Sequence, residues 1–493
     1  MAPSAPITNA DANARTGEEP TSGRSSAVWL WAIVALGAAL RLIALGYKSF
    51  WLDEIASVVT TRLPGNAFWS MLWHEEGNMA LYYVLLRPWL HLGTGEASVR
   101  LLSVVPGIAS IPVMYFLGRR LFGPRTGMLA AIFLALNACA IGVSQEARSY
   151  SLLVFAVLLS TYLFVCLIER PSYAMACAYG LVAGLTFYCQ YFGLLVPAAH
   201  AVSLAALPQD RRPWKQLSLA ACIIAVAAVP VLWMIHIQNL GHITWVPRLS
   251  WLEVYHLGAY FAAGSGKAIG AILLALDLAL VGLFLSSLGK LWRDRRQDLR
   301  CWRYALPASS LLTPTVIALL ASIPRPIFYH RFLIIGLPAW VLMTAVGAEK
   351  IRNPKGRRAA IAGVCVLSLA STMIGYTRVQ EDWRGVTRYL MAQAQPGDRV
   401  LYYQSEGYFA VENYRNWLAG GDAPRPQAVI VQSPEGDWAQ QMDHAPRVWL
   451  VLYRARTDDP ATRSIQSQLG NSYAQERQAS FRAVTVIEYR AQP

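Results

Sequence analysis

The sequence predicts an α-helical polytopic membrane protein with about eleven transmembrane helices and a C-terminal extracytoplasmic α/β domain. Three observations lead to this fold class: few charged residues, repeated apolar runs of spanning length, and a soluble composition after residue 376. Of the 493 residues, 55% are hydrophobic and 15% are charged. Because ordinary soluble domains are roughly a quarter charged, this chain cannot cover a soluble surface and is expected to face lipid.

The apolar runs give the expected spans, because a helix that crosses the hydrocarbon core needs about 20 mostly apolar residues. They begin near Ala27, Ser98, Thr126, Ser149, Ala174, Tyr191, Gln216, Ala268, Tyr304, Arg331 and Ala359. The pair between residues 174 and 206 is short for two crossings. Residues 1–26 are rich in Ala, Ser, Thr and Pro and too polar for a cleaved signal peptide. We therefore expect a disordered cytoplasmic tail before an uncleaved first span.

The distribution of basic residues predicts orientation. The formal net charge is +14, but nucleic-acid binding needs Lys and Arg gathered on one solvated surface. Here many of them fall in short blocks between apolar runs, at 119–125, 211–215, 290–303 and 350–358. This positive-inside pattern places the N-terminus in the cytoplasm, and an odd number of crossings then places the C-terminal domain outside. We expect a bacterial inner membrane and no nucleic-acid partner, although an endoplasmic reticulum membrane follows the same topology rule.

Composition divides the chain into the tail at 1–26, a transmembrane domain at 27–376 and a soluble domain at 377–493. The transmembrane domain carries outside loops at 47–97, 144–149, 237–267 and 323–331. Aromatic residues in the first loop favour the membrane interface, so we expect short helices on the outer leaflet there. The soluble part has strand-like runs at 399–404, 427–432, 447–453 and 483–489, with helical patterns at 383–394 and 408–418. This alternation predicts a small α/β domain.

Two acidic clusters stand out in the first outside loop. Asp53 and Glu54 directly follow the first span, and adjacent carboxylates at a membrane surface are costly unless something uses them. The alternative is a pair of solvated acids, one of them paired with Arg62. Further on, a histidine with neighbouring carboxylates could ligate a divalent cation, although an ordinary polar loop would look the same; these residues are His74, Glu75 and Glu76.

Two shorter outside loops also carry candidate residues. In the loop at 144–149, Glu146 and Arg148 flank an alanine, and Tyr150 begins the next span. A capping ion pair is the alternative, but this turn holds more polar groups than capping requires. The loop at 323–331 is basic, against the charge rule for outside loops, which suggests phosphate binding or arginines that snorkel to headgroups. Its candidates are Arg325, Tyr329, His330 and Arg331.

The order and placement of four motifs carry a family resemblance. They are Leu52-Asp53-Glu54; the stretches 81–83, 100–103 and 118–123; residues 144–152, the most specific; and His330-Arg331-Phe332-Leu333 with Leu337-Pro338. Together they resemble the family that includes the protein O-mannosyltransferases and the lipid A aminoarabinose transferases. The chain departs from it at Asn78-Met79-Ala80-Leu81-Tyr82, where the family often has His-Pro-Pro-Leu-Tyr, and at Arg331-Phe332, where it often has Arg-Tyr.

The resemblance implies a type C glycosyltransferase fold, a polyprenyl-phosphate-sugar donor, and a lipid, protein or polysaccharide acceptor. It implies an inverting, one-step displacement, for which Asp53 is the expected carboxylate base. Glu54 and Glu146 would orient the substrate or a divalent metal. Fixed cations would stabilise the leaving phosphate, and the expected substrate contacts are Tyr82, Arg148, Tyr150, Arg325, Tyr329, His330 and Arg331. Arg41 and Lys267 are weaker candidates, and snorkelling is favoured for Arg41.

Three other readings compete with this one. A transporter or flippase predicts functional polar residues deep in the spans and often an inverted repeat, whereas the sequence has few intramembrane charges, such as Asp277, and no visible repeat. A non-catalytic scaffold leaves the acidic clusters without a reason. Within the enzyme class, related transferases use lipid-pyrophosphate oligosaccharides and a bound metal. The sequence identifies neither the sugar nor the acceptor.

Overall fold

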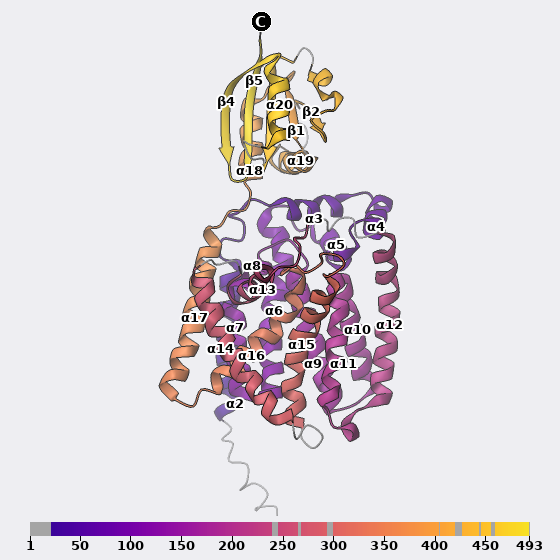
Figure 1. Ribbon diagram of the computed structural model, residues 1–493, viewed down its shortest axis with the longest axis vertical. Helices are drawn as coiled ribbons and strands as arrows, with labels where there is room; N and C mark the ends of the chain where they lie inside the picture. Colours follow the sequence, from indigo (N-terminus) through magenta and orange to yellow (C-terminus); the bar gives the residue numbers. More distant parts are fainter. Residues whose placement is uncertain are drawn as a thin grey trace, which may run out of the picture.

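The computed structural model describes residues 21–238, 245–264, 268–292, 299–403, 405–419, 426–442, 445–454 and 459–492. Within them a helical membrane domain is joined at one end to a small α/β domain (Figure 1). The first helix, α2 (Thr21–Leu42), begins inside the segment predicted as tail, while residues 1–20 lie outside the described part. Lys267 and much of the loop after residue 238 also lie outside it.

Seven helices in the described part are long and apolar enough to cross a membrane. They are α6 (Glu96–Phe122), α9 (Tyr150–Glu169), α12 (Trp214–Ile237), α14 (Ala268–Leu291), α15 (Leu299–Ala321), η7 with α16 (Phe332–Glu349) and α17 (Pro354–Thr377). An eighth span forms if α7 (Pro124–Leu136) and α8 (Ala138–Ser144), bent by 56°, count as one. The chain is therefore a multi-pass integral membrane protein.

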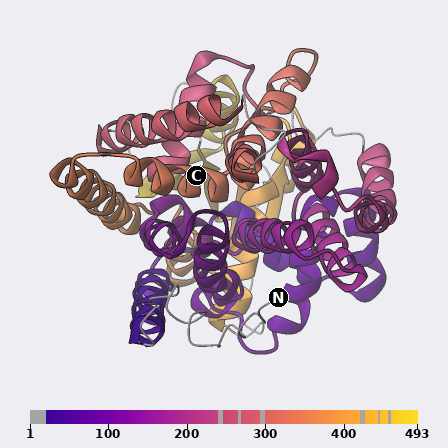
Figure 2. The ribbon, with the colours of Figure 1, turned by 90° about the horizontal axis from the view of Figure 1, so that it is seen from below.

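Three shorter apolar segments complete the membrane domain. They are the apolar part of α2 at Ser26–Leu42, α10 (Tyr173–Cys189), and η2 with α11 at Tyr191–Ala206. Every apolar run in the sequence coincides with a helical segment, but eleven crossings stay a prediction because these three are short. Figure 2 shows the helices nearly end-on, viewed from below.

Close helix contacts depend on glycines. A Cβ on Gly118 of α6 would lie 2.9 Å from the Cα of Gly127 of α7. A Cβ on Gly347 of α16 would collide with the carbonyl group of Leu280 of α14. Small residues let helix backbones approach closely where lipid provides no hydrophobic driving force. These contacts hold together the helices whose outer ends carry the polar loops.

Short helices occupy the first outside loop. They are α3 (Leu52–Arg62), α4 (Gly65–His74), η1 (Gly77–Met79) and α5 (Ala80–Trp89). In Figure 1, α3 lies at the end of the membrane domain that faces the C-terminal domain. The second such loop contains α13 (Trp251–Ala263). Their position on an outer leaflet stays a prediction.

The C-terminal domain has one five-stranded mixed sheet, with strand order β2-β1-β3-β5-β4. Its elements are α18 (Trp383–Gln393), β1 (Arg399–Tyr403), α19 (Ser405–Ala419), β2 (Gln427–Val431), η8 (Asp437–Met442), β3 (Arg447–Tyr453), α20 (Pro460–Gly470), β4 (Tyr473–Phe481) and β5 (Val484–Ala491). β1 runs parallel to β2 and β3, while β5 is antiparallel to β3 and β4. The predicted α/β class is confirmed.

The sequence analysis missed α20 and β4. β4 is an edge strand that is exposed over most of its length, and it carries Glu476 and Arg477, so it shows no apolar alternation. Charged residues on an edge strand discourage pairing with another sheet, which is why such strands are difficult to predict from apolar patterns.

The C-terminal domain packs on the first outside loop through polar contacts. Tyr414 of α19 donates a hydrogen bond to Glu96 (2.8 Å) and accepts one from the backbone N–H of Phe50 (2.6 Å). Arg384 of α18 pairs with Glu96 (3.1 Å) and donates to the carbonyl oxygen of Tyr47 (2.6 Å). Glu96 is 3% exposed, so its contacts with Tyr414 and Arg384 are shielded from solvent and fix the domain on the loop.

Candidate active site at the outer ends of the helices

Glu54 is fully buried and joins three segments. Its carboxylate accepts two hydrogen bonds from the guanidinium group of Arg100 on α6, each 2.7 Å, and one from the backbone N–H of Ala147 (2.8 Å). It also accepts a hydrogen bond from the backbone N–H of Trp51 (3.3 Å). A bidentate charged pair of this kind fixes geometry as well as charge. Glu54 therefore orders the loops around its neighbour Asp53, and its expected role in orienting substrate stays a prediction.

Asp53, by contrast, is accessible. Its side chain is 43% exposed, and its nearest cation is the guanidinium group of Arg148, 3.7 Å away. Arg148 also donates to the carbonyl oxygen of Asp53 (3.1 Å), so the two residues are held together by backbone and side chain. Burial alone would lower the pKa of Arg148, but Asp53, together with Tyr83, Tyr150 and Glu76, raises that pKa. A fixed cation thus lies beside an accessible carboxylate.

Glu146 and Arg331 form a second ion pair at the same end of the helices. The guanidinium group of Arg331 lies 4.8 Å from the ring centre of Tyr150 and 5.1 Å from that of Trp51. Cation–π contacts of this kind fix a guanidinium plane. Burial alone would lower the pKa of Arg331, but the charge of Glu146 raises it above the ordinary value. The structure thus brings together Asp53, Glu146, Arg148, Tyr150 and Arg331 from separate loops.

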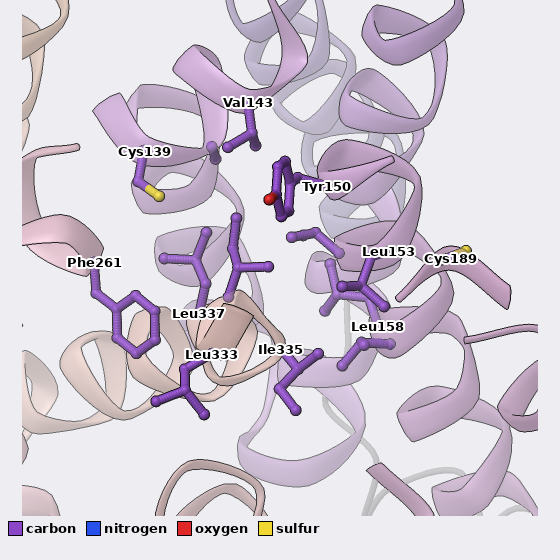
Figure 3. Packing of buried hydrophobic residues seen from close by; sticks show 14 of the residues in the cluster. Cys139, Val143, Tyr150, Leu153, Leu158, Cys189, Phe261, Leu333, Ile335 and Leu337 are labelled. Atoms are coloured by element: carbon purple, nitrogen blue, oxygen red, sulfur yellow. The ribbon is translucent and has the colours of Figure 1, made fainter. Parts of the chain in front are cut away.

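Apolar packing fixes the position of Tyr150. Figure 3 shows it among Cys139 and Val143 of α8, Leu153 of its own helix and Leu337 of α16. The residue is 3% exposed. Since packed side chains have few alternative rotamers, the ring is a rigid support for Arg331.

Several buried donor atoms around this cluster have no acceptor within the described part of the chain. They are Nε1 of Trp51, Nε of Arg148 and Nε of Arg331, together with Nδ1 of His330, whose role depends on its tautomer. Buried polar atoms normally have partners. Donors of this kind suit a ligand rich in acceptor oxygens, such as a phosphate or a sugar.

Tyr82 is packed beneath the loop at 144–149, and its expected contact with substrate stays a prediction. It is fully buried, and its hydroxyl lies 3.0 Å from the hydroxyl oxygen of Ser103. Ser103 in turn donates to the carbonyl oxygen of Arg148 (3.1 Å). Through Ser103, Tyr82 therefore helps to fix the backbone of the loop that carries Arg148.

The aromatic residues of the last loop pack against α13 and the preceding loop. The ring of His330 lies 4.9 Å from that of Tyr260 and 4.3 Å from that of Tyr329. Tyr329 also meets Trp245 at 5.0 Å. Arg325 is exposed, and its substrate contact stays a prediction, as do those of Tyr329 and His330.

The metal candidates do not come together. Nδ1 of His74 lies 2.9 Å from the carbonyl oxygen of Ser70, and Glu76 accepts a hydrogen bond from the hydroxyl of Tyr83 (3.0 Å). Across the described ranges, no group of three or more His, Cys, Asp or Glu side chains is placed to hold a metal ion. In the described part of the chain, His74, Glu75 and Glu76 are thus not brought together as a group of three ligands.

Arg41 is neither a phosphate ligand nor a snorkelling side chain. It is fully buried and donates to the carbonyl oxygens of Gly37 (3.0 Å), Leu134 (3.3 Å) and Ala135 (3.2 Å). The last two lie where α7 ends at its bend. Arginine near a helix C-terminus satisfies free carbonyl groups, so Arg41 stabilises the break between α7 and α8.

Arg100 is the residue whose role the sequence analysis missed. It is 3% exposed and, besides Glu54, it donates to the carbonyl oxygens of Leu45 (2.8 Å), Lys48 (2.8 Å) and Ser49 (3.1 Å). The available signal was an arginine in the first turns of an apolar span. A buried charge needs a charged or polar partner; the nearest acid in the sequence is Glu96, whereas the structure pairs Arg100 with Glu54, 46 positions earlier.

We expect His330 to make stability depend on acidity. Burial, with the charges of Arg331 and His256, lowers its pKa to about 4, against about 6.5 in an unfolded chain. The unfolded state therefore binds more protons between these values, so stability is fully present above about pH 6.5 and is lost toward pH 4. In thermal unfolding scans, His330→Gln should flatten this decline, while His91→Gln, at an exposed position, should not. An equally steep decline in both variants would contradict the prediction.

A polytopic helical domain, an acid–arginine cluster at one of its ends and a C-terminal α/β domain form the architecture that the sequence analysis expected of a type C glycosyltransferase fold. Residues 81–235 match the dolichyl-phosphate-mannose-protein mannosyltransferase family. The chain is 24% identical over 354 residues to the lipid A galacturonosyltransferase RgtD of Rhizobium johnstonii, covering 67% of each protein.

Solved structures show the same architecture. ArnT from Cupriavidus metallidurans in the apo state superposes with a TM-score of 0.61 at 12% identity, covering 94% of this chain and 98% of that one. The same protein bound to undecaprenyl phosphate gives 0.56 at 13% identity, covering 93% and 98%. These comparisons confirm the fold class and the resemblance to the protein O-mannosyltransferase and lipid A aminoarabinose transferase family.

Proposed function

We propose that this protein transfers a sugar from a polyprenyl-phosphate-sugar donor to an acceptor on the extracytoplasmic face of a bacterial inner membrane. The observation that carries the proposal is one accessible carboxylate, Asp53, beside two arginines whose Nε atoms lack a protein partner. The relatives support the class of reaction and of donor, since one is a galacturonosyltransferase and another binds undecaprenyl phosphate. The N-terminus then lies in the cytoplasm and the C-terminal domain outside.

The proposed reaction is a single displacement. An acceptor hydroxyl or amine gives its proton to the carboxylate of Asp53 as its oxygen or nitrogen bonds to the anomeric carbon. The bond between that carbon and the phosphate oxygen breaks, and its electron pair leaves with the phosphate. Attack opposite to the leaving group inverts the anomeric configuration. Because a phosphate leaves as a stabilised anion, the step needs no general acid.

Negative charge grows on the leaving phosphate, so fixed cations stabilise the transition state more than the ground state. Arg331 is the proposed main contact, and Glu146 holds it in place. Arg148 pairs with Asp53 and also stabilises the negative charge that develops on the leaving phosphate. The proposed acceptor is a hydroxyl or amine of a lipid, protein or polysaccharide. It can reach Asp53 because the side chain of Asp53 is exposed.

A transfer assay tests the proposal. The purified chain is incubated with a panel of radiolabelled polyprenyl-phosphate sugars and a membrane extract, and product is resolved into lipid, protein and polysaccharide fractions. Transfer from one donor, with inverted product, supports the proposal. Absence of both transfer and lipid binding across the panel contradicts it, and transport assays in vesicles would follow. Asp277, the intramembrane acid that a transporter could use, accepts a hydrogen bond from Nε1 of Trp340 (3.0 Å). This contact gives Asp277 a structural role and favours the transferase over the transporter.

Arg331→Lys should lower kcat/KM for transfer by about 100-fold, the effect of losing one preorganised donor. Lysine keeps the charge but loses the planar group that contacts Tyr150 and pairs with Glu146. Arg303→Lys is the matched control, because Arg303 lies 3.8 Å from Glu169 and is 37% exposed. Initial rates at varied donor concentration measure both. Equal rates in the two variants would remove Arg331 from the site.

A further inference from the structure

A buried carboxylate connects the C-terminal domain to the catalytic loop. Glu381 lies between α17 and α18 and is fully buried. It accepts hydrogen bonds from Nε1 of Trp383 (2.8 Å), the hydroxyl of Tyr453 (2.6 Å) and the guanidinium group of Arg454 (3.0 Å). All three donors belong to the C-terminal domain, so the carboxylate is anchored there.

The fourth donor belongs to the membrane domain. It is the backbone N–H of Leu52, the first residue of α3, 2.9 Å from Oε2 of Glu381. The first N–H groups of a helix have no partner within it, and a carboxylate is favoured there by the helix dipole. Asp53 is the next residue, so this bond holds the peptide that carries the proposed base.

Helix α3 cannot supply this cap by itself. Its N-cap residue is Trp51, whose side chain makes no capping hydrogen bond, whereas serine, threonine, aspartate or asparagine would provide an acceptor. Glu54 reaches back only to the N–H of Trp51. The acceptor for Leu52 therefore comes from Glu381, more than three hundred positions later in the chain.

Tyr453 holds the same carboxylate from the C-terminal domain. It lies at the end of β3, and burial together with the charges of Glu381 and Asp53 raises its pKa. The contacts of Arg384 and Tyr414 hold the residues just before Leu52. The C-terminal domain thus contacts the backbone of Tyr47, Phe50 and Leu52, where α3 begins.

We propose that Glu381 is a positioning residue, through which the C-terminal domain caps α3 and sets the orientation of Asp53. The inference rests on the proposed function, because it gives Asp53 the role of base. Glu381 does not touch substrate; it acts through the Leu52–Asp53 peptide. Its loss should lower the turnover rate and leave the KM for the donor unchanged.

The test compares Glu381→Gln with Glu488→Gln in the full-length protein. Glutamine keeps the shape but replaces one acceptor oxygen by an amide group and removes the charge. Glu488 is the matched control because it is also buried in the C-terminal domain and ion-paired, with Arg447 (3.3 Å), without contacting α3. Thermal unfolding and size-exclusion profiles establish that both variants fold.

Hydrogen–deuterium exchange of the peptide covering residues 50–56 gives a reading that does not depend on activity. Loss of a charged hydrogen bond should speed exchange at Leu52 by about 10- to 100-fold in Glu381→Gln and leave it unchanged in Glu488→Gln. Unchanged exchange in Glu381→Gln would overturn the proposal.

Kinetics give the second reading. Glu381→Gln should lower kcat by about 10- to 100-fold with unchanged KM, as expected for a misplaced catalytic group. In an Asp53→Asn background it should cost less than about twofold more, because both act through one group. Faster exchange with unchanged kcat would overturn the positioning role. If the parent protein transfers no sugar, the proposed function fails, and the exchange result alone decides whether Glu381 caps α3.

Discussion

Asp53→Asn should lower kcat for sugar transfer by about 10²- to 10⁴-fold, the range for losing a general base. Asparagine has nearly the same shape and keeps an acceptor oxygen, but it cannot take the acceptor's proton at neutral pH. Asp53 is 43% exposed and 3.7 Å from Arg148, and Arg148 keeps its hydrogen bond to the carbonyl oxygen of residue 53 in this variant. We therefore expect normal folding and a nearly unchanged KM for the lipid donor.

Asp210→Asn is the control for this variant. Asp210 is 75% exposed and lies 3.6 Å from Arg211, in a loop predicted to face the cytoplasm. Single-turnover rates with labelled donor separate chemistry from product release. An Asp53→Asn protein that keeps more than a third of the parent rate would exclude Asp53 as base, and Glu146 would become the next candidate.

Glu54→Gln should cause the largest loss of stability, because it leaves the buried guanidinium group of Arg100 without its counter-charge. Removing one partner of a buried ion pair typically costs about 3–5 kcal/mol. The loss should propagate, since Arg100 also orders the carbonyl groups of Lys48 and Ser49 before α3. We expect a clearly lower unfolding midpoint and little remaining transfer.

The partly exposed pair of Arg120 and Glu169 provides the comparison. Their atoms lie 2.5 Å apart, with side chains 26% and 23% exposed, so Glu169→Gln should cost about 1 kcal/mol or less. Unfolding monitored by intrinsic fluorescence in detergent measures both variants. Similar midpoints for Glu54→Gln and Glu169→Gln would show that burial of the Arg100 pair contributes little.

The fold class could be predicted because membrane spans are simple in composition. Long apolar runs and the blocks of basic residues between them are local signals, and each run coincides with a helical segment. The C-terminal domain was harder, since β4 shows no apolar alternation and only Ile465 and Leu469 mark the apolar face of α20. The exposed edge strand depends on its pairing with β5, which only the folded domain supplies.

For the site, too, local sequence signals predicted some residues, while other roles depend on the folded structure. Adjacent acids and a basic outside loop suggested Asp53, Glu146, Arg148 and Arg331, and the structure brings these four into one cluster. The sequence could not distinguish Asp53 from Glu54, because adjacent residues on a helix point in different directions and only packing decides which is buried. The roles of Arg100 and Glu381 depend on contacts between segments far apart in the chain.

The docking of the last domain on the first loop has a consequence for biogenesis. Residues 47–52 leave the ribosome early. The side chains that hydrogen-bond to their backbone groups are those of Glu381, Arg384 and Tyr414, which are synthesised after all the spans. With every helix already inserted, the nascent protein would still lack an ordered first outside loop until its C-terminal domain had folded. If the proposed function holds, a truncation after α17 should therefore yield an inserted but inactive protein.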